Sequence, residues 1–211
     1  MRARDVMSES VFSVSADATA LDAAQLFVNC RVSALPVVDP AGSILGIVTK
    51  ADLMWPQGQE RQARMVVDVM THEVVIAAED TPLAELARLM SEHAVKRLPI
   101  VRNGRVVGMV SRTDLLRALI ALESGHDQRG PRGERDQQLR HDIAAACRGR
   151  SWSRAQQLDV VVSRGIAHLW GIAPSVLVRK AYEVAAENVP GVKAVKMHMH
   201  IVPPSGARVG L

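Results

Sequence analysis

The chain contains GIVTKADL at Gly46–Leu53 and GMVSRTDL at Gly108–Leu115, two copies of one pattern at an offset of 62 residues. They belong to a longer repeat, because RDVM and ALPVVD return later as VDVM and RLPIVR at an offset of 63. Independent segments do not keep their turn, strand and helix signals in one order at one spacing, so the repeat indicates duplication of a folding unit. We therefore expect two similar units, residues 1–61 and 62–123, that pack face to face.

Each copy predicts a helix, a hairpin and a second helix, with a short strand ahead of them near Val11–Val14 or Val74–Ile76. In the second copy, Thr81 predicts an N-cap before a proline, and apolar residues follow at helical spacing. Two apolar runs about Arg102–Gly104 predict the hairpin, and Asp39–Gly42 stands at the same turn in the first copy. The apolar helical positions are Leu83, Leu86, Ala87 and Met90.

The composition is that of an ordinary folded protein, with 211 residues of which 48% are hydrophobic and 23% charged. Such a chain can bury a core and form one or two domains. No apolar run approaches the roughly 20 residues that span a bilayer, and the start lacks a signal-peptide pattern, so we expect a cytoplasmic protein. Cys30 and Cys147 show no CxxC spacing, which favours two reduced thiols over a disulfide.

Charge divides the chain into two parts. Residues 1–123 carry 13 Lys/Arg and 15 Asp/Glu, whereas residues 124–211 carry 13 and 7, a balance of −2 against +6. The polar segment SGHDQRGPRGERDQ, residues 124–137, predicts a linker. Residues 138–204 then predict helix, strand, strand, helix and strand, with a turn at Ser163–Gly165. The expected fold class is α/β (α+β): two pseudo-symmetric units and a small α-β-β-α-β domain.

The junction between the second hairpin strand and the next helix carries the chemistry of each repeat. Thr49 and Ser111 are N-cap residues, and the first amides of a helix attract phosphate. Asp52 and Asp114 follow three residues later, where a carboxylate can accept both hydroxyls of a ribose. The same spacing is also a capping box, which only satisfies helix amides, and spacing alone leaves both interpretations open.

The repeat resembles a tandem pair of CBS domains, a Bateman module, over about residues 1–122, because both copies contain D-V-M, the L-P strand and G-h-V-[ST]-x-x-D. The resemblance implies clefts that bind an adenosyl ligand such as AMP, ADP, ATP or S-adenosylmethionine, with the acids on ribose, the hydroxyls near phosphate and the L-P segments beside the base. It also implies a homodimer. The implied nucleotide-binding residues are Ser33, Ala34, Leu35, Pro36, Thr49, Lys50, Asp52, Lys96, Arg97, Leu98, Pro99, Ser111, Arg112 and Asp114.

Charge separates the two implied sites. The second has Lys96, Arg97 and Arg112, against Arg31 and Lys50 in the first. Charge-assisted contacts then predict that the second site suits a di- or triphosphate better. The alternative is that these long side chains only cover apolar surface.

Residues 138–204 resemble a BON domain, on the strand-turn-strand with Gly165 and Gly171 and the ending NVPGVKAVKMHMHIV. The resemblance implies attachment to anionic phospholipid or to a protein partner and no catalytic set, with a location peripheral to the membrane as one outcome. Basic residues there form either a binding surface or a solvated face. Trp152 and Trp170 are either interfacial anchors or core residues. The candidate surface residues are Arg164, Arg179, Lys180, Lys193 and Lys196.

No catalytic motif is present in the sequence. His198 and His200 alternate on a predicted strand without a carboxylate or cysteine at ligand spacing, so we interpret them as surface histidines and expect no metal. The chain lacks a nucleophile elbow, a Walker loop and a dinucleotide fingerprint, so we expect a non-enzymatic protein without a required cofactor. Three hypotheses follow: a regulatory sensor of an adenosyl ligand, a ligand-independent scaffold, and a nucleic-acid binder through the basic segment. The last ranks lowest, because aromatics make up only 3% of the chain.

Overall fold

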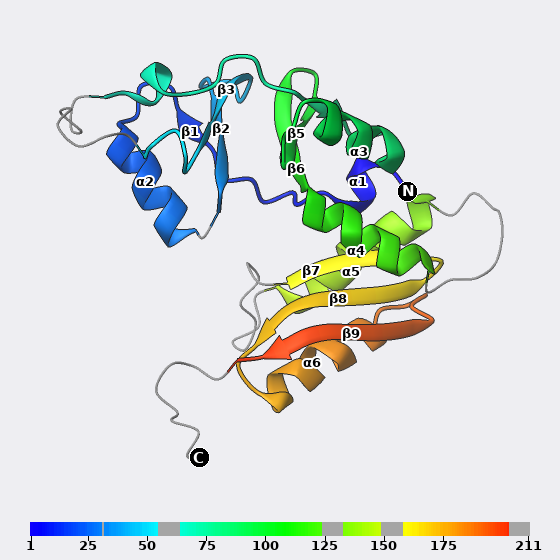
Figure 1. Cartoon of the computed structure of the whole chain (residues 1–211). Helices are drawn as coiled ribbons and strands as arrows, with labels where there is room; N and C mark the ends of the chain where they lie inside the picture. The colour runs from blue at the N-terminus through cyan, green and yellow to red at the C-terminus, as the bar shows by residue number, and fades with distance from the viewer. Residues whose placement is uncertain (31, 55–63, 124–132, 149–157, 203–211) are drawn as a thin grey trace. The chain divides into compact units, whose positions relative to one another are not determined.

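The computed structural model describes residues 1–30, 32–54, 64–123, 133–148 and 158–202. The chain forms two compact units, an N-terminal unit of Arg2–Leu115 and a C-terminal unit of Leu116–Leu211 together with Met1. Figure 1 shows the course of the chain through both.

The N-terminal unit contains two three-stranded sheets of one topology. In each, a short leading strand lies parallel to the first hairpin strand, which pairs antiparallel with the second. This agreement confirms the duplication of one folding unit. The leading strands lie at the end of, or just beyond, the predicted segments. The strands are β1 (Val14–Ser15), β2 (Ala34–Val38) and β3 (Ile44–Thr49), then β4 (Ala77–Ala78), β5 (Arg97–Arg102) and β6 (Arg105–Ser111).

An amphipathic helix precedes each hairpin, α2 (Ala20–Asn29) in the first copy and α3 (Leu83–Glu92) in the second. Leu86 and Met90 of α3 are buried, as predicted, but Ala87 is exposed. Helix α4 (Arg112–Glu123) follows the second hairpin. In the first copy, residues 50–53 form a turn, and the remainder of the predicted second helix lies outside the described residues.

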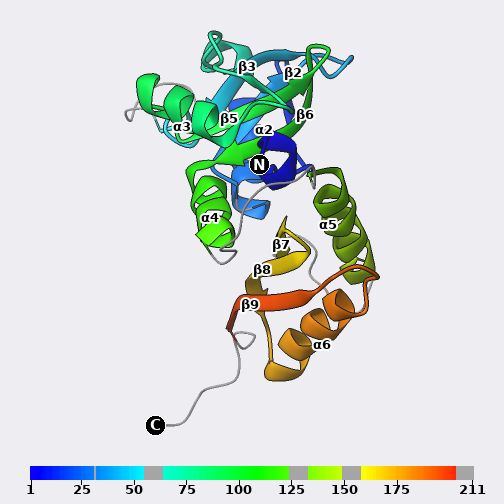
Figure 2. The same cartoon turned by 90° about the vertical axis from the view of Figure 1, so that its right-hand side faces the viewer.

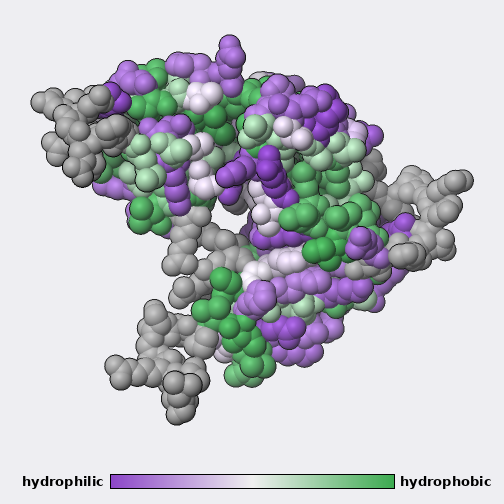
Figure 3. All heavy atoms as spheres, in the orientation of Figure 1, coloured by the Kyte–Doolittle hydropathy of each residue, from purple (hydrophilic) through white to green (hydrophobic). Residues whose placement is uncertain are grey.

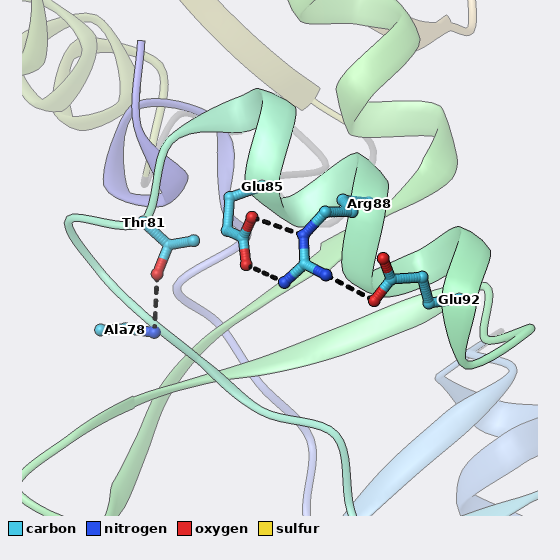
Figure 4. Close-up of polar contacts among 5 residues, drawn as sticks. All are labelled: Ala78, Thr81, Glu85, Arg88 and Glu92. Atoms are coloured by element: carbon cyan, nitrogen blue, oxygen red, sulfur yellow. Dashed lines mark hydrogen bonds and ion pairs between the residues drawn. The ribbon is translucent and has the colours of Figure 1, made fainter.

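The start of α3 corrects a prediction. Its N-cap is Pro82, which is extended, and the helix begins one residue later. Thr81 does not cap the helix; its Oγ1 accepts a hydrogen bond from the Ala78 amide at 3.1 Å and closes the turn after β4 (Figure 4). The hydroxyl is used locally because Ser and Thr side chains compete for nearby backbone amides.

The outer face of α3 is held by charged side chains. Figure 4 shows Arg88 between Glu85 and Glu92, with its Nε and Nη2 on the Glu85 carboxylate at 2.8 and 2.6 Å and its Nη1 on Glu92 at 2.5 Å. Residues three and four apart on a helix are neighbours, so these pairs bridge adjacent turns. This face of α3 is therefore polar, opposite the buried side.

The leading segment of each repeat packs on the other repeat. The short helix α1 (Ala3–Val6) begins the first copy, yet the amides of Ala3 and Arg4 donate to Thr81 and Glu79 of the second, at 2.9 Å each. Conversely, the 3₁₀ helix η2 (Val66–Asp68) belongs to the second copy, and its Val66 amide donates to the Ala18 carbonyl at 2.8 Å.

This exchange extends into the core. Val66 is fully buried in the cluster that Phe27, Leu35 and Val48 form in the first copy. The sequence repeat and the packing unit therefore differ, because each folded half takes its first segment from the other copy. The two copies are consequently tied together by buried apolar contacts as well as by backbone hydrogen bonds.

The C-terminal unit has the predicted order of helix, strand, strand, helix and strand. Its sheet has the order β7-β8-β9, with β7 antiparallel and β9 parallel to the central β8. Both helices lie on one face (Figure 2), where Ile143 and Tyr182 are buried with Leu169 and Met199 of the sheet. The elements are α5 (Gly133–Cys147), β7 (Leu158–Ser163), β8 (Ile166–Ala173), α6 (Val176–Glu187) and β9 (Ala194–Ile201).

Helix α5 begins earlier than the sequence indicates, since it includes residues 133–137 of the predicted linker. The reason is visible at Asp136, whose carboxylate accepts the amides of Arg164 and Gly165 at 2.7 and 2.8 Å. These two residues form the β7–β8 turn with positive φ, 56° and 78°, so that their consecutive amides converge on one anion. A tertiary contact thus fixes the polar start of the helix.

Candidate functional site

The hairpins bring together the segments that the sequence selects for ligand binding. Ala34 pairs with Thr49 across the β2–β3 hairpin, and Arg97 pairs with Ser111 across β5–β6. We call residues 33–36 with 49–52 the first junction, and residues 96–99 with 111–114 the second junction. In the second, the Arg112 amide also donates to the Lys96 carbonyl at 3.1 Å.

Several of the predicted binding residues have side chains that are buried. Leu35 and Leu98 are fully buried, and Pro36 and Pro99 are buried as well. Because these side chains are buried, the two segments can offer a ligand their backbone rather than their side chains. Ser33 is half-buried.

At the first junction, the carboxylate of Asp52 contacts the hydroxyl of Thr49. The Thr49 hydroxyl and amide both donate to Oδ2 of Asp52, at 2.8 and 2.7 Å. Asp52 is half-buried, and Lys50 beside it is exposed. Half of a capping box is therefore formed at a turn, next to an exposed cation.

The second junction has the same two hydrogen bonds between hydroxyl residue and acid, and one more. Ser111 donates from its hydroxyl and amide to Oδ2 of Asp114, at 2.6 and 2.8 Å, and the Asp114 amide donates back to the Ser111 Oγ at 3.4 Å. Asp114 is only 7% exposed. This is the reciprocal geometry of a capping box, at the start of a helix that continues for three turns.

The predicted cations of the second junction are not equivalent. Arg112 donates from Nη2 to the Met90 carbonyl at 3.2 Å, near the end of α3. Lys96 is exposed and Arg97 half-buried. One of the three charges thus holds a helix end, where cations are favoured by the helix dipole. Arg31 lies outside the described residues.

Each junction is bordered by a segment of the other repeat, which the sequence did not reveal. Ser8 pairs with Met109 of β6 through hydrogen bonds of 2.9 and 3.0 Å, and Thr71 pairs with Ile47 of β3 in the same way. The recurring D-V-M followed by a hydroxyl marks both segments. A repeat pattern cannot show which copy such a segment packs against, because both choices leave the spacing unchanged.

The five candidate basic residues of the C-terminal unit lie on three parts of it: the β7–β8 turn with its neighbouring segment, helix α6 and strand β9. Lys193 lies beside the β7–β8 turn, where its amide donates to the Gly165 carbonyl at 2.8 Å, and Arg164 is part of that turn. Arg179 and Lys180 lie on α6, and Lys180 pairs with Glu183 at 2.9 Å. Lys196 lies on β9 and is exposed.

Three rings stack on the face of the sheet opposite α5 and α6. Trp170 lies 4.5 Å from His198 between ring centroids, and His198 Nε2 lies 3.0 Å from His168 Nδ1. Burial, with the charges of His198 and Lys196, lowers the pKa of His168 to about 4. His198 thus partners His168 rather than His200. Among the described residues, no group of three or more His, Cys, Asp or Glu is placed to hold a metal.

An exposed apolar patch, which we call the apolar tip, lies at one end of the same unit. Leu177 is 83% and Val176 66% exposed at the start of α6. The Val202 amide donates to the Ala173 carbonyl at 2.9 Å, which brings the end of β9 beside the end of β8. Figure 3 shows apolar atoms gathered there. The apolar tip comprises Ile172, Val176, Leu177, Ile201 and Val202.

In the part of the chain that the structure describes, no helix is both long and apolar enough to cross a bilayer. Cys30 and Cys147 are free thiols, as predicted. Trp152 lies outside the described residues, whereas Trp170 is half-buried in the ring stack.

Comparison with curated proteins finds similarity to an enzyme and to a protein named for its CBS domains. The inosine-5'-monophosphate dehydrogenase of Methanocaldococcus jannaschii is 34% identical over 158 residues, which are 74% of this chain and 29% of that enzyme. The CBS domain-containing protein YhcV of Bacillus subtilis is 35% identical over 115 residues, 53% of this chain and 81% of that protein. This chain spans less than half the length of the first three curated relatives.

Solved structures with this fold hold adenosyl compounds. The CBS domain pair of protein MJ0100, in complex with 5'-methylthioadenosine and S-adenosyl-L-methionine, is 28% identical with a TM-score of 0.52, and the match covers 56% of this chain and 95% of that chain. CBSX2 in complex with AMP is 25% identical with a TM-score of 0.52, over 56% of this chain and 96% of that chain.

The CBS domain profile matches residues 3–55 and 66–121, which include both junctions, and the BON domain profile matches residues 135–203. The chain therefore belongs to the CBS domain family, with two CBS segments followed by a BON domain.

Proposed function

We propose that this chain is a non-enzymatic regulatory protein that binds an adenosyl ligand, namely AMP, ADP, ATP or S-adenosylmethionine, at its CBS junctions. The observation that carries the proposal is that each hairpin places a hydroxyl, a carboxylate and a cation beside the L-P segment of its partner strand. The fold neighbours that hold adenosyl compounds support it.

The contacts suggest a role for each group. A carboxylate oxygen accepts from the vicinal hydroxyls of ribose, because ionised Asp is an acceptor-only group. Exposed Lys50 and Lys96 supply positive charge for a phosphate or for the carboxylate of S-adenosylmethionine. The backbone of residues 33–36 and 96–99 offers hydrogen bonds to the base, since the Leu and Pro side chains there are buried.

Ligand-dependent unfolding tests this function. A ligand that binds the folded chain and not the unfolded chain raises the unfolding temperature as its concentration exceeds Kd. With protein freed of co-purified nucleotide, we expect at least one of the four adenosyl ligands to raise this temperature in a saturable way, whereas GMP serves as the control. Absence of any shift with all four would favour a ligand-independent scaffold.

The second half of the proposal is that the BON domain relays the bound state to an anionic membrane surface, which would place a cytoplasmic protein at the membrane periphery. The apolar tip favours this role, because two exposed apolar side chains in the first turn of α6 are followed by Arg179 and Lys180 in the next turn. Apolar insertion and nearby cations are the two terms that hold a helix at a lipid surface.

Vesicle flotation tests the relay with a matched pair of variants on one helix. We expect the chain to float with phosphatidylglycerol vesicles and Leu177→Ser to weaken this. Val184→Ser serves as the control, since Val184 is also exposed, at 42%, but lies two turns away. Equal flotation of all three proteins, or none by the parent chain, would instead favour a protein partner for this unit.

A further inference from the structure

Two adjacent valines show that both faces of the C-terminal sheet are covered. Val161 and Val162 of β7 are each 3% exposed, but only Val162 belongs to the apolar cluster that α5 and α6 form with the sheet. Successive side chains of a strand point to opposite faces. Val161 therefore lies on the other face, where its cross-strand partner His168 is fully buried.

Helix α4 reaches this second face. Its second half belongs to the same compact unit as the sheet, and Nη1 of Arg117 lies 2.8 Å from Oδ2 of Asp159. Asp159 precedes Val161 by two residues on β7, so both side chains lie on one face. The ion pair thus fastens the second half of α4 to the face that carries Val161 and His168.

The surroundings of His168 on this face disfavour a positive charge. Its Nδ1 lies 3.0 Å from Nε2 of His198, and its Nε2 has no hydrogen-bond partner in the described part of the chain. Burial, with the charges of His198 and Lys196, lowers the pKa of the ring to about 4. The ionisable side chains that the sheet and the second half of α4 bring to this region are Asp159, Lys196, His198, His200, Arg117 and Glu123.

A proton on His168 would destabilise the covered face. The protonated ring has an N–H on both nitrogens, and only the one at Nδ1 can be donated to His198. The N–H at Nε2 would be buried without an acceptor among the described residues, and the carboxylate of Asp159 is paired with Arg117. A buried donor without an acceptor and a buried charge both cost free energy, and both costs disappear when the ring reaches water.

We infer that the contact between α4 and the C-terminal sheet is a pH-sensitive latch: a proton on His168 releases α4 from the face that carries Val161, while the opposite face stays packed beneath α5 and α6. Because α4 begins at Arg112 of the second junction, release separates the sheet from the helix that leaves the CBS repeat. The latch goes beyond the proposed binding functions and does not rest on either of them.

Thiol labelling at the two adjacent positions tests the latch in the full chain. Val161→Cys and Val162→Cys place a thiol on opposite faces at equal burial. Labelling with dithiodipyridine, read at each site by peptide mass and normalised to the unfolded chain at the same pH, measures how often each face opens. With a pKa of 6.5 in the open state and about 4 in the closed state, linkage predicts that opening at position 161 rises about twentyfold from pH 7 to pH 5.

Position 162 separates local opening from unfolding of the whole unit. Its thiol is reached only when the core beneath α5 and α6 opens, and local openings require less free energy than global unfolding. We therefore expect position 162 to label at least about tenfold more slowly than position 161 at pH 5.

Further changes, each combined with Val161→Cys, identify the proton site and the released element. His168→Leu should remove the rise in labelling, whereas His200→Leu, which changes an exposed histidine of the same face, should keep it. His168→Gln, which does not titrate, replaces the leucine variant if that variant does not fold. Arg117→Gln should speed labelling already at pH 7, because it removes the ion pair with Asp159.

Four results would overturn the latch. Equal labelling at positions 161 and 162 at pH 5 would show that the whole unit unfolds, and a constant rate at position 161 would show that acid does not open the face. A rise that persists without His168 would belong to another group. An unchanged rate in Arg117→Gln at pH 7 would show that another element covers the face. None of these results bears on adenosyl binding.

Discussion

At the residue scale, two glycines allow the exchanged segments to approach their strands. A Cβ on Gly46 would lie 2.6 Å from Met70 Sδ and 2.9 Å from the Thr71 carbonyl oxygen. The three atoms nearest to a Cβ on Gly108 would all belong to the side chain of Met7, the equivalent methionine of the other repeat. Glycine is therefore favoured at the two positions where the D-V-M motif of one repeat packs against the G-h-V motif of the other repeat.

Alanine at these glycines should destabilise the chain unequally. Gly46→Ala presses on backbone that is hydrogen-bonded to Ile47, so we expect a loss of about 1–3 kcal/mol, typical of overpacking. Gly108→Ala should lose less, because a methionine side chain can change rotamer. Urea unfolding of both variants measures the difference, and an equal or reversed order would contradict this packing account.

His168 makes a second prediction at this scale. Its pKa is lowered from 6.5 to about 4 in the folded chain, first by burial, so the unfolded chain binds more protons between these values. Stability contributed by the neutral ring is then complete above about pH 6.5 and is lost as the pH falls toward 4. We expect unfolding in urea to become easier from pH 7 to pH 5, and His168→Leu to reduce this dependence. An unchanged pH dependence in the variant would show that other groups cause it.

At the element scale, a polar contact rather than the apolar pattern fixes the start of helix α5. Helix α5 begins at residues that have a linker composition, and α3 begins one residue after Pro82. In α5 the deciding contact comes from a turn 28 residues away, through Asp136. Sequence periodicity reports the buried face of an element well and its ends less well, since the ends depend on such partners.

Removal of the Asp136 carboxylate should destabilise the C-terminal unit. Asp136→Ala leaves two amides of the β7–β8 turn without their acceptor, and we expect a loss of about 1–3 kcal/mol. Asp142→Ala on the same helix is the matched control, because the one contact of Asp142 among the described residues is an exposed hydrogen bond from Gln138. Urea unfolding of the two variants should separate them; equal stability would mean that the turn amides find another acceptor.

The hairpins and the contacts at their ends could be predicted from the sequence only in part. The repeat and its turn residues predicted both hairpins and their order, because Asn103 and Gly104 adopt the positive φ that a two-residue turn requires. The pairing of Thr49 with Asp52 and of Ser111 with Asp114 was likewise predicted from spacing. The burial of Asp114, the role of Arg112 at α3 and the exchange of D-V-M segments depend on distant parts of the chain, which no local pattern specifies.

At the scale of the whole molecule, we propose ligand binding by the N-terminal unit and attachment by the C-terminal unit. The exposed side chains Leu21 and Val28 of α2 lie on one face, seven residues apart, and are consistent with a further contact between copies of the chain. We expect a homodimer, so native mass spectrometry should give twice the chain mass of 22.9 kDa. A mass of one chain at micromolar concentration would contradict this expectation.

Adenosyl binding is tested most directly by a calorimetric titration of AMP, ADP, ATP and S-adenosylmethionine into the full chain after removal of any co-purified ligand. We predict saturable heat with at least one of them, because each junction places a carboxylate against a hydroxyl at the end of a hairpin. Absence of saturable heat with all four would contradict ligand binding.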